Sequence, residues 1–180
     1  MNDESVTIRR LTPADLFTVI EAEQAIFPED AWSDALLTEE LNRPDRFYLG
    51  AFENDEMVGY VGARLGIDTD LMTVGVYPHA RGRGIGRQLV LELLSHVRHV
   101  QITSDYQFSF EPVAPPAGVG IIRPIRHVER VLLEVRVSNV AAITLYETLG
   151  FRGIGTISDY YRHPLEDALV MEAHLSGSEN

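Results

Sequence analysis

DLMTVGVYPHARGRGIGRQLVLELLSHVR, residues 70–98, holds a strand, a glycine-rich turn and a helix in direct succession. The apolar and β-branched residues up to Tyr77 favour a strand, and Pro78 ends it because proline has no N–H to donate to a sheet. From Gly84 to Arg98 the apolar residues recur at helical spacing. A strand that leads through a short turn into a helix is typical of an α/β domain.

The turn between this strand and this helix is Arg81-Gly82-Arg83-Gly84-Ile85-Gly86-Arg87. Glycine lets the backbone approach a ligand closely, and the first N–H groups of a helix, together with its dipole, favour a bound phosphate. Three of the chain's 15 basic residues lie within these seven positions, which supports an anion site. A P-loop would need lysine, and the Rossmann fingerprint spaces its glycines differently. The alternative is a plain structural turn.

The rest of the chain predicts strands and helices on both sides of this unit. Thr12 and Pro13 favour the start of a helix that runs to about Phe27. Residues 128–137, VERVLLEVRV, are so continuously apolar that they predict a central strand buried on both faces. The other expected elements are strands at 6–11, 46–53, 57–65, 151–158 and 167–175, a helix at 34–42 capped by Ser33, and a helix at 140–149 capped by Asn139 and ended by Gly150.

The order is therefore β-α-α-β-β-β-α-β-α-β-β, an α/β (α+β) arrangement with a mixed central sheet of about seven strands and about four helices. The 180 residues fit one domain, since single domains run to roughly 100–200 residues. Residues 100–128 hold four of the nine prolines and are expected to form a long flexible surface loop. A short polar tail, 176–180, closes the domain.

The composition excludes several kinds of chemistry. The chain has no cysteine and no lysine, which rules out disulfides, thiolate metal sites, a cysteine-bound intermediate and a Schiff-base lysine. The six histidines do not show the spacing of a metal site, so no metal is expected. No stretch approaches the roughly 18 apolar residues of a membrane span, and the start lacks the apolar core of a signal peptide, so we expect a soluble, cytoplasmic protein.

The net charge of −12 is unevenly distributed. Residues 1–56 carry 14 acidic side chains and four arginines, a net charge of −10, which leaves −2 for the remainder. Such an acidic region repels nucleic acid and anionic membranes and suits a cationic partner. The alternative is a surface that serves solubility alone. The oligomeric state does not follow from these features.

Two motifs now point to a known family. The pattern R-x-x-G-x-G at 81–86, after V-x-V-x-P at 74–78, resembles the acetyl-CoA pyrophosphate loop of the GCN5-related N-acetyltransferases (GNAT). LEVRVSNVAAITLYETLGF, residues 133–151, closely resembles the ribosomal-protein alanine N-acetyltransferase (RimI) subfamily, as do FPEDAWS at 27–33 and the pair Tyr160-Tyr161. The resemblance covers about 5–98 and 129–175. Glu29-Asp30-Ala31 lengthen FP…WS relative to the compact pattern of the subfamily.

The resemblance implies the GNAT fold, acetyl-CoA as cosubstrate and a set of cofactor-binding residues. The phosphates would lie on the loop at 81–87, and pantetheine would bond backbone groups of the third strand, with the Val76 N–H near the developing oxyanion. Asn139 would add a contact to CoA. The implied cofactor-binding residues are Val74, Gly75, Val76, Arg81, Gly82, Arg83, Gly84, Ile85, Gly86, Arg87 and Asn139.

Acetyl transfer to an amine needs a base, an acid and oxyanion stabilisation. Glu134 lies in the middle of an apolar strand, where an unpaired carboxylate is costly, and the resemblance assigns it the role of base, acting directly or through water. The alternative is a salt bridge with Arg136 or a contact at the edge of the sheet. Tyr146, two helical turns after Asn139, is the candidate general acid, with a core tyrosine as the alternative. Without cysteine, direct transfer in a ternary complex is expected.

By the same resemblance, Phe27, Pro28, Tyr160 and Tyr161 would form the walls of a peptide groove, with packing in the core as the alternative for the aromatic pair. Trp32 would line the same entrance or pack between helices. The leading hypothesis is acetylation of a protein N-terminus, most specifically the N-terminal alanine of ribosomal protein bS18, whose basic tail the acidic region would attract. The alternatives are acetylation of a small amine (a polyamine, amino acid or antibiotic) and a non-catalytic CoA-binding adaptor.

Overall fold

A computed structural model describes residues 5–103, 107–111 and 126–175 of the chain. Its helices are η1 (Pro13–Asp15), α1 (Leu16–Ile26), α2 (Asp34–Asn42), η2 (Pro78–Ala80), α3 (Ile85–Val97) and α4 (Val140–Thr148). Its strands are β1 (Thr7–Arg10), β2 (Arg46–Glu53), β3 (Glu56–Arg64), β4 (Asp68–Val76), β5 (Gln101–Ile102), β6 (Phe108–Ser109), β7 (Arg126–His127), β8 (Arg130–Arg136), β9 (Arg152–Arg162) and β10 (Leu165–His174).

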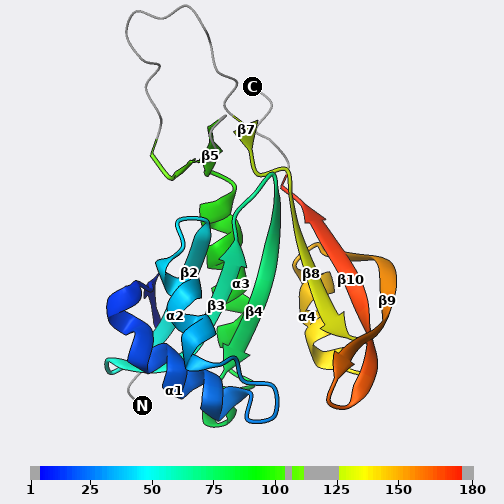
Figure 1. The fold of residues 1–180 in the computed structure, drawn as a ribbon, viewed down its shortest axis with the longest axis horizontal. Helices are drawn as coiled ribbons and strands as arrows, with labels where there is room; N and C mark the ends of the chain where they lie inside the picture. The colour runs from blue at the N-terminus through cyan, green and yellow to red at the C-terminus, as the bar shows by residue number, and fades with distance from the viewer. Residues whose placement is uncertain (1–4, 104–106, 112–125, 176–180) are drawn as a thin grey trace, which may run out of the picture.

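Seven of these strands form one mixed sheet in the order β1-β2-β3-β4-β8-β10-β9. Neighbours in this sheet are antiparallel except β4 and β8, which run parallel and pair only where Asp68–Asp70 meets Arg130–Leu132. Beyond that point the two strands diverge, and Figure 1 shows them spreading apart toward the C-terminal end of each strand. The mixed α/β fold expected from the sequence, with its seven-stranded sheet and four α-helices, is confirmed.

Local side-chain chemistry sets the helix starts. Thr12 and Asp15 form a reciprocal capping box at η1, which leads directly into α1. The Ser33 hydroxyl accepts a hydrogen bond from the Leu36 N–H at 3.3 Å, and the Asn139 side chain accepts one from the Ala142 N–H at 3.1 Å. Each of these bonds satisfies an N–H group that the first turn of a helix leaves without a partner.

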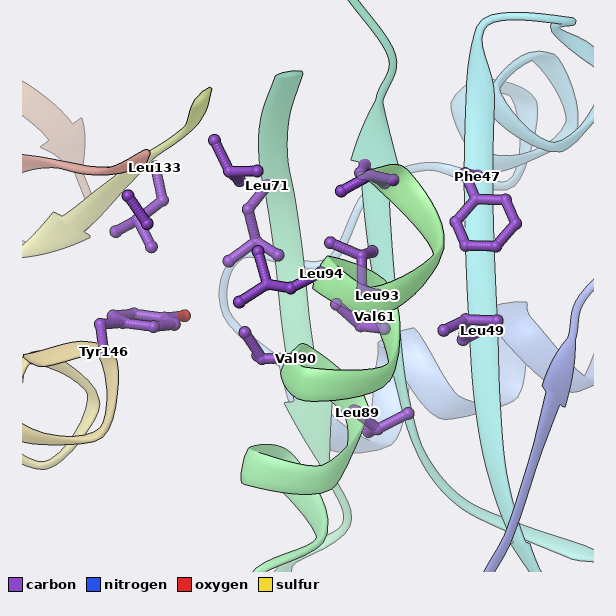
Figure 2. Packing of buried hydrophobic residues seen from close by; sticks show 14 of the residues in the cluster. Phe47, Leu49, Val61, Leu71, Leu89, Val90, Leu93, Leu94, Leu133 and Tyr146 are labelled. Carbon is purple, nitrogen blue, oxygen red and sulfur yellow. The ribbon is translucent and has the colours of Figure 1, made fainter. Parts of the chain in front are cut away.

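Two apolar clusters hold the helices against opposite faces of the sheet. Helices α1 and α2 lie in front of the sheet in Figure 1, and α3 lies behind β2, β3 and β4. The larger cluster joins α3 to the sheet and extends to α4; Figure 2 shows Val90 and Leu94 of α3 near Leu71 of β4, with Leu133 of β8 and Tyr146 of α4 on the other side. This packing places α4 and the start of α3 beside the point where β4 and β8 diverge.

The expectation that residues 128–137 are buried on both faces is wrong. Val131, Leu133 and Val135 are buried, whereas Glu134 between them is exposed. The reason is the placement of the helices: α1 and α2 cover the half of the sheet around β2 and β3, so β8 is covered by the apolar cluster on one face only. The strand is central in the sheet, as expected, but it presents its other face to a ligand or solvent.

The segment 100–128 contains more regular structure than expected. Within its described part, β5 pairs with both β6 and β7 in a small antiparallel sheet. Ile102 and Val128 are buried in the main cluster, so a flexible surface loop is wrong for these residues. Residues 104–106 and 112–125 of this segment, and the expected tail at 176–180, lie outside the described residues, so the expectations for them stay predictions. Within the described part of the chain, no helix is long and apolar enough to cross a membrane.

Candidate active site

The candidate active site is a cleft of about 270 Å³ at the point where β4 and β8 diverge. It takes residues from both strands, from α4 and from the segment between α1 and α2. The lining residues are Glu23, Phe27, Asp30, Trp32, Leu71, Met72, Thr73, Val74, Leu133, Glu134, Val135, Arg136, Asn139, Ala142, Tyr146 and Tyr161.

One wall of the cleft is the edge of β4. The register between β3 and β4 shifts at one point: Gly62 pairs with Thr73 but Ala63 pairs with Leu71, so Met72 is an extra residue in β4. Such a bulge bends a strand and interrupts its pairing. After Asp70, β4 has no pairing with β8, so alternate backbone groups along 71–76 face the cleft side rather than another strand. The expected cofactor residues Val74, Gly75 and Val76 belong to this open edge, and Val74 lines the cleft.

Glu134 projects from β8 into the cleft. Glu134 is exposed at the mouth of the cleft but partly desolvated by its walls, and this partial burial raises the pKa of its carboxyl; the nearby Asp70 carboxylate raises it further, and Arg64 opposes this shift. The salt bridge with Arg136 that the sequence left open is not formed: Arg136 pairs with Asp30 and Glu166 instead. Among the residues that the structure describes, Glu134 has no guanidinium partner and lies near a second carboxylate, which suits a group that takes up a proton.

Tyr146 lines the cleft from α4. Its side chain is only 8% exposed, and burial raises the pKa of its hydroxyl to about 12, with the neighbouring Tyr161 as a second cause. The ring centre lies 5.6 Å from that of Phe151, and Figure 2 shows the ring extending from α4 toward Leu71 and Leu94. Tyr146 is thus a core tyrosine that also lines the cleft, and it stays protonated at neutral pH. Asn139, at the start of the same helix, also lines the cleft.

The glycine-rich turn leads into α3 as expected. Gly82 and Gly84 have φ values of 74° and 80°, a region that favours glycine, and a Cβ on either would meet no atom within 4 Å. The first helical hydrogen bond inside this turn runs from the Gln88 N–H to the Gly84 carbonyl at 3.0 Å. The N–H groups of Ile85, Gly86 and Arg87 precede that bond, so they are placed to bind an anion.

The three arginines of the turn have different surroundings. The Arg81 Nε donates to the Val76 carbonyl at 3.0 Å, which ties the turn to the end of β4. Arg83 makes a two-point ion pair with Glu53 of β2, with Nη1 to Oε2 at 2.9 Å. Arg87 lies in the first turn of α3. Arg83 therefore fastens the turn to the sheet, a role that the sequence did not indicate.

The other end of the cleft is aromatic and acidic. Phe27, Trp32 and Tyr161 line it, as does the buried Glu23, which accepts hydrogen bonds from the Trp32 N–H at 2.9 Å and from the Tyr60 hydroxyl. Trp32 both lines the cleft and packs against the cluster under α1 and α2. Pro28 and Tyr160 are not part of the lining. Each is adjacent in sequence to a lining residue, and the Tyr160 ring packs edge-on against Tyr161 with centres 5.0 Å apart.

Sequence reasoning missed Glu23, Asp30 and Met72 as residues of the site. Glu23 carried a signal, because it is a carboxylate at an apolar position of the α1 spacing. The bulge at Met72 and the place of Asp30 carry no local signature. Chemically, the cleft is lined by a carboxylate of raised pKa and a protonated phenol beside an open strand edge, an arrangement able to take a proton from one reactant and donate to another.

Comparisons with known proteins identify the family of the chain. Residues 16–108 match the acetyltransferase (GNAT) family model. N-alpha-acetyltransferase RimI of Mycobacterium tuberculosis is 36% identical over 174 residues, which cover 93% of this chain and 92% of that protein. The [ribosomal protein bS18]-alanine N-acetyltransferase of Salmonella typhimurium is 28% identical over 176 residues, 94% and 98% of the two chains.

The fold comparison is equally extensive. The crystal structure of the ribosomal-protein-S18-alanine N-acetyltransferase from Escherichia coli superposes with a TM-score of 0.76 at 24% identity, covering 98% of this chain and 97% of the other. That likeness concerns the fold, whereas the family model and the 36% identical relative concern the sequence. The chain therefore belongs to the GNAT family of acetyltransferases, enzymes that use acetyl-CoA, and within it to the RimI-like N-alpha-acetyltransferases.

Proposed function

We propose that this enzyme acetylates the α-amino group of a protein N-terminus, most specifically the N-terminal alanine of ribosomal protein bS18, by direct transfer from acetyl-CoA. The observation that carries the proposal is that Glu134 of β8 and Tyr146 of α4 line one cleft, beside the open edge of β4. The relatives named for bS18-alanine acetylation, at 28% and 27% identity, support the choice of acceptor.

The residues present fit acetyl-CoA. Its phosphates would be held by the first-turn N–H groups of α3 at 85–87, where Gly82 and Gly84 leave the approach free of side chains. Its pantetheine arm would bond the backbone of Val74, Gly75 and Val76, and Asn139 would contact it from α4. Bound there, acetyl-CoA supplies the acetyl thioester that the amine attacks.

Three groups of the chain then have separate roles in the transfer. Glu134 takes a proton from the acceptor ammonium, directly or through water, so that the neutral amine forms the new C–N bond. The Val76 N–H, on the open edge of β4, would stabilise the negative charge that develops on the acetyl oxygen. Tyr146 donates a hydrogen bond to the sulfur as the C–S bond breaks, and the leaving thiolate takes up the second amine proton, which the nitrogen releases as the amide forms. Because a pKa of about 12 lies above that of a thiol, about 8.5, donation to the sulfur suits this phenol better than complete loss of its proton.

The acceptor end favours a cationic chain. Glu23, Asp30 and Glu134 all line the cleft, and the only arginine among the lining residues, Arg136, is already paired with Asp30 and Glu166. Phe27, Trp32 and Tyr161 add apolar walls for the first residues of a peptide. An acidic, aromatic groove of this kind suits a basic N-terminal tail by attraction at long range and by contact at short range.

The decisive experiment is a thiol-release assay with acetyl-CoA and peptides that begin Ala-Arg, compared with the same peptides blocked at the N-terminus, with spermidine and with an aminoglycoside. We expect turnover of the free peptides alone. Glu134→Gln and Tyr146→Phe should each lower kcat by about 10²- to 10⁴-fold, whereas Glu147→Gln, on the exposed side of α4, should not.

Each other outcome contradicts a separate part of the proposal. Turnover of the small amines without turnover of peptides would overturn the protein acceptor and favour a small-molecule acetyltransferase. Tight CoA binding without turnover of any amine would favour the adaptor. Full activity of both variants would show that Glu134 and Tyr146 are not the base and the acid.

A further inference from the structure

Arg136 connects two walls of the cleft that come from distant parts of the chain. Its Nη2 donates to Asp30 Oδ2 at 2.9 Å, in the segment between α1 and α2, and to the His163 carbonyl at 2.8 Å, in the turn between β9 and β10. Its Nη1 donates to the Pro164 carbonyl at 3.1 Å and to Glu166 Oε2 at 3.2 Å. Both terminal nitrogens of the guanidinium are thus occupied by acceptors of the chain itself.

The two ends of this connection differ in exposure. The Glu166 side chain is 15% exposed, and its second oxygen accepts from the Ser138 N–H at 2.7 Å, so this end is held from two sides. The Asp30 side chain is 49% exposed and makes one contact with Arg136. Water and salt weaken an ion pair at the exposed end far more than at the sheltered one. The Asp30 contact is therefore the end that opens first.

Arg136, itself the last residue of β8, also packs on Tyr161. Its guanidinium carbon lies 4.2 Å from the centre of the Tyr161 ring, over its face. The Tyr161 hydroxyl in turn donates to the backbone carbonyl of Glu134 at 3.2 Å. Glu134 and Arg136 are two positions apart on β8 and so share a face of the sheet, and both line the cleft. A single side chain thus joins the segment 27–33, the β9–β10 turn and the strand that bears Glu134.

We infer that Arg136 is a positioning residue for the acceptor: its ion pair with Asp30 draws the segment between α1 and α2 onto the β9–β10 turn and thereby sets how tightly the acceptor chain is held. The inference rests on the proposed function for the nature of that chain. It assigns Arg136 no contact with acetyl-CoA, because both of its terminal nitrogens are bonded to Asp30, Glu166 and the β9–β10 turn. Loss of the Asp30–Arg136 pair should therefore change the KM of the acceptor and not that of acetyl-CoA.

The test is steady-state kinetics with each substrate varied in turn, for the wild type, Asp30→Asn, Arg136→Gln, Arg136→Lys and the double variant. Loss of the Asp30 contact should raise the acceptor KM about two- to fivefold. Arg136→Gln, which also loses the bonds to the turn, should raise it roughly tenfold, and Arg136→Lys should lie between them. The acetyl-CoA KM should stay within about twofold of the wild type in every variant.

Two comparisons make the result specific. The double variant should be no worse than Arg136→Gln alone, because both substitutions break the same pair and residues in contact are not additive. Arg152→Gln is the matched control: Arg152 is a 70% exposed arginine of β9 that pairs with Glu172 and does not line the cleft, so its acceptor KM should not change. Additive losses, or equal losses in the acetyl-CoA KM, would overturn the inference.

Hydrogen exchange separates failure of this inference from failure of the proposed function. The amides of residues 29–33 should exchange faster in Asp30→Asn and in Arg136→Gln than in the wild type or Arg152→Gln, whichever amine is the acceptor. Unchanged exchange would show that the pair does not hold this segment. A wild type that acetylates small amines but no peptide would overturn the proposed acceptor, and the KM comparison would then be made with that amine.

Discussion

The hydroxyl of Tyr161 donates a hydrogen bond to the backbone carbonyl of Glu134 over 3.2 Å. This bond links β9 to β8 across the cleft wall, although β10 lies between the two strands in the sheet. It fixes the ring of Tyr161 above the strand that carries the proposed base. The position of Glu134 therefore depends on a residue 27 positions later in the chain.

Tyr161→Phe removes this hydrogen bond and keeps the ring. We expect kcat to fall about three- to tenfold, because a hydrogen bond of this kind contributes roughly 1 kcal/mol. Tyr161→Ala should cost more, because it also removes the ring under Arg136. The measurement is kcat with saturating acetyl-CoA and peptide. Equal activity of Tyr161→Phe and the wild type would show that the bond does not help to place Glu134.

The acid limb of the pH profile should respond to Asp70 and Arg64 in opposite directions. Glu134 is active as a base when ionised, and burial and then Asp70 raise its pKa while Arg64 lowers it. Asp70→Asn therefore shifts the acid limb of kcat to lower pH, and Arg64→Gln shifts it to higher pH. The measurement is kcat against pH at saturating substrate. Shifts of the same sign in the two variants would contradict this electrostatic account.

Tyr146 should contribute no ionisation to the profile below about pH 10, because its pKa is about 12. Tyr146→Phe is expected to lower kcat by roughly 10²-fold or more while the shape of the profile up to that pH stays that of the wild type. Profiles of both proteins between pH 6 and pH 10, a range that ends about two units below that pKa, would show this. A limb that vanishes in the variant would mean that Tyr146 ionises within the range.

Gly84→Ala should lower the free energy of unfolding by about 1–2 kcal/mol, because an alanine at φ 80° is strained even where space is free. The acetyl-CoA KM should rise as well, since the strain displaces the first-turn amides of α3. Gly86→Ala is the comparison for stability: its Cβ would meet Val76 at 3.6 Å, an ordinary contact. Denaturant unfolding measures the stability of both variants, and steady-state kinetics measures the acetyl-CoA KM. An equal loss of unfolding free energy in the two variants would refute the argument from φ.

Glu23 should make the protein less stable as the pH rises above the usual carboxyl range. Burial raises its pKa above 4.5, although the Trp32 N–H opposes this shift, so the folded state holds its proton at a pH where the unfolded state has lost it. Unfolding free energy then falls as pH rises from about 4.5 through the raised value. Glu23→Gln should flatten this decline, while Glu21→Gln on the exposed side of α1 should leave it unchanged. Denaturant midpoints between pH 4 and pH 8 test the difference.

Much of the local structure could be predicted from short stretches of the chain. Ser33 and Asn139 mark helix starts because their side chains accept from N–H groups three residues later, and the Thr12 N–H donates to the Asp15 carboxylate in the same way at η1. Gly150, with φ 90°, ends α4. The turn at 81–87 was recognisable for the same reason, since its glycines and the following helix lie within a few residues. Glu134 was noticeable because a carboxylate interrupts an apolar strand.

Other features depend on which strands become neighbours and where their pairing ends. The one-sided burial of β8 follows from the placement of α1 and α2 over the other half of the sheet, and the cleft exists because β4 and β8 pair over three residues and then separate. The partners of Arg83 and Arg136 are 30 and 106 positions away. Caps, turns and periodicity act over one or two turns of chain and are written in the local order of residues, whereas the cleft, the Asp30–Arg136 pair and the environment of Glu134 arise only when distant segments pack together.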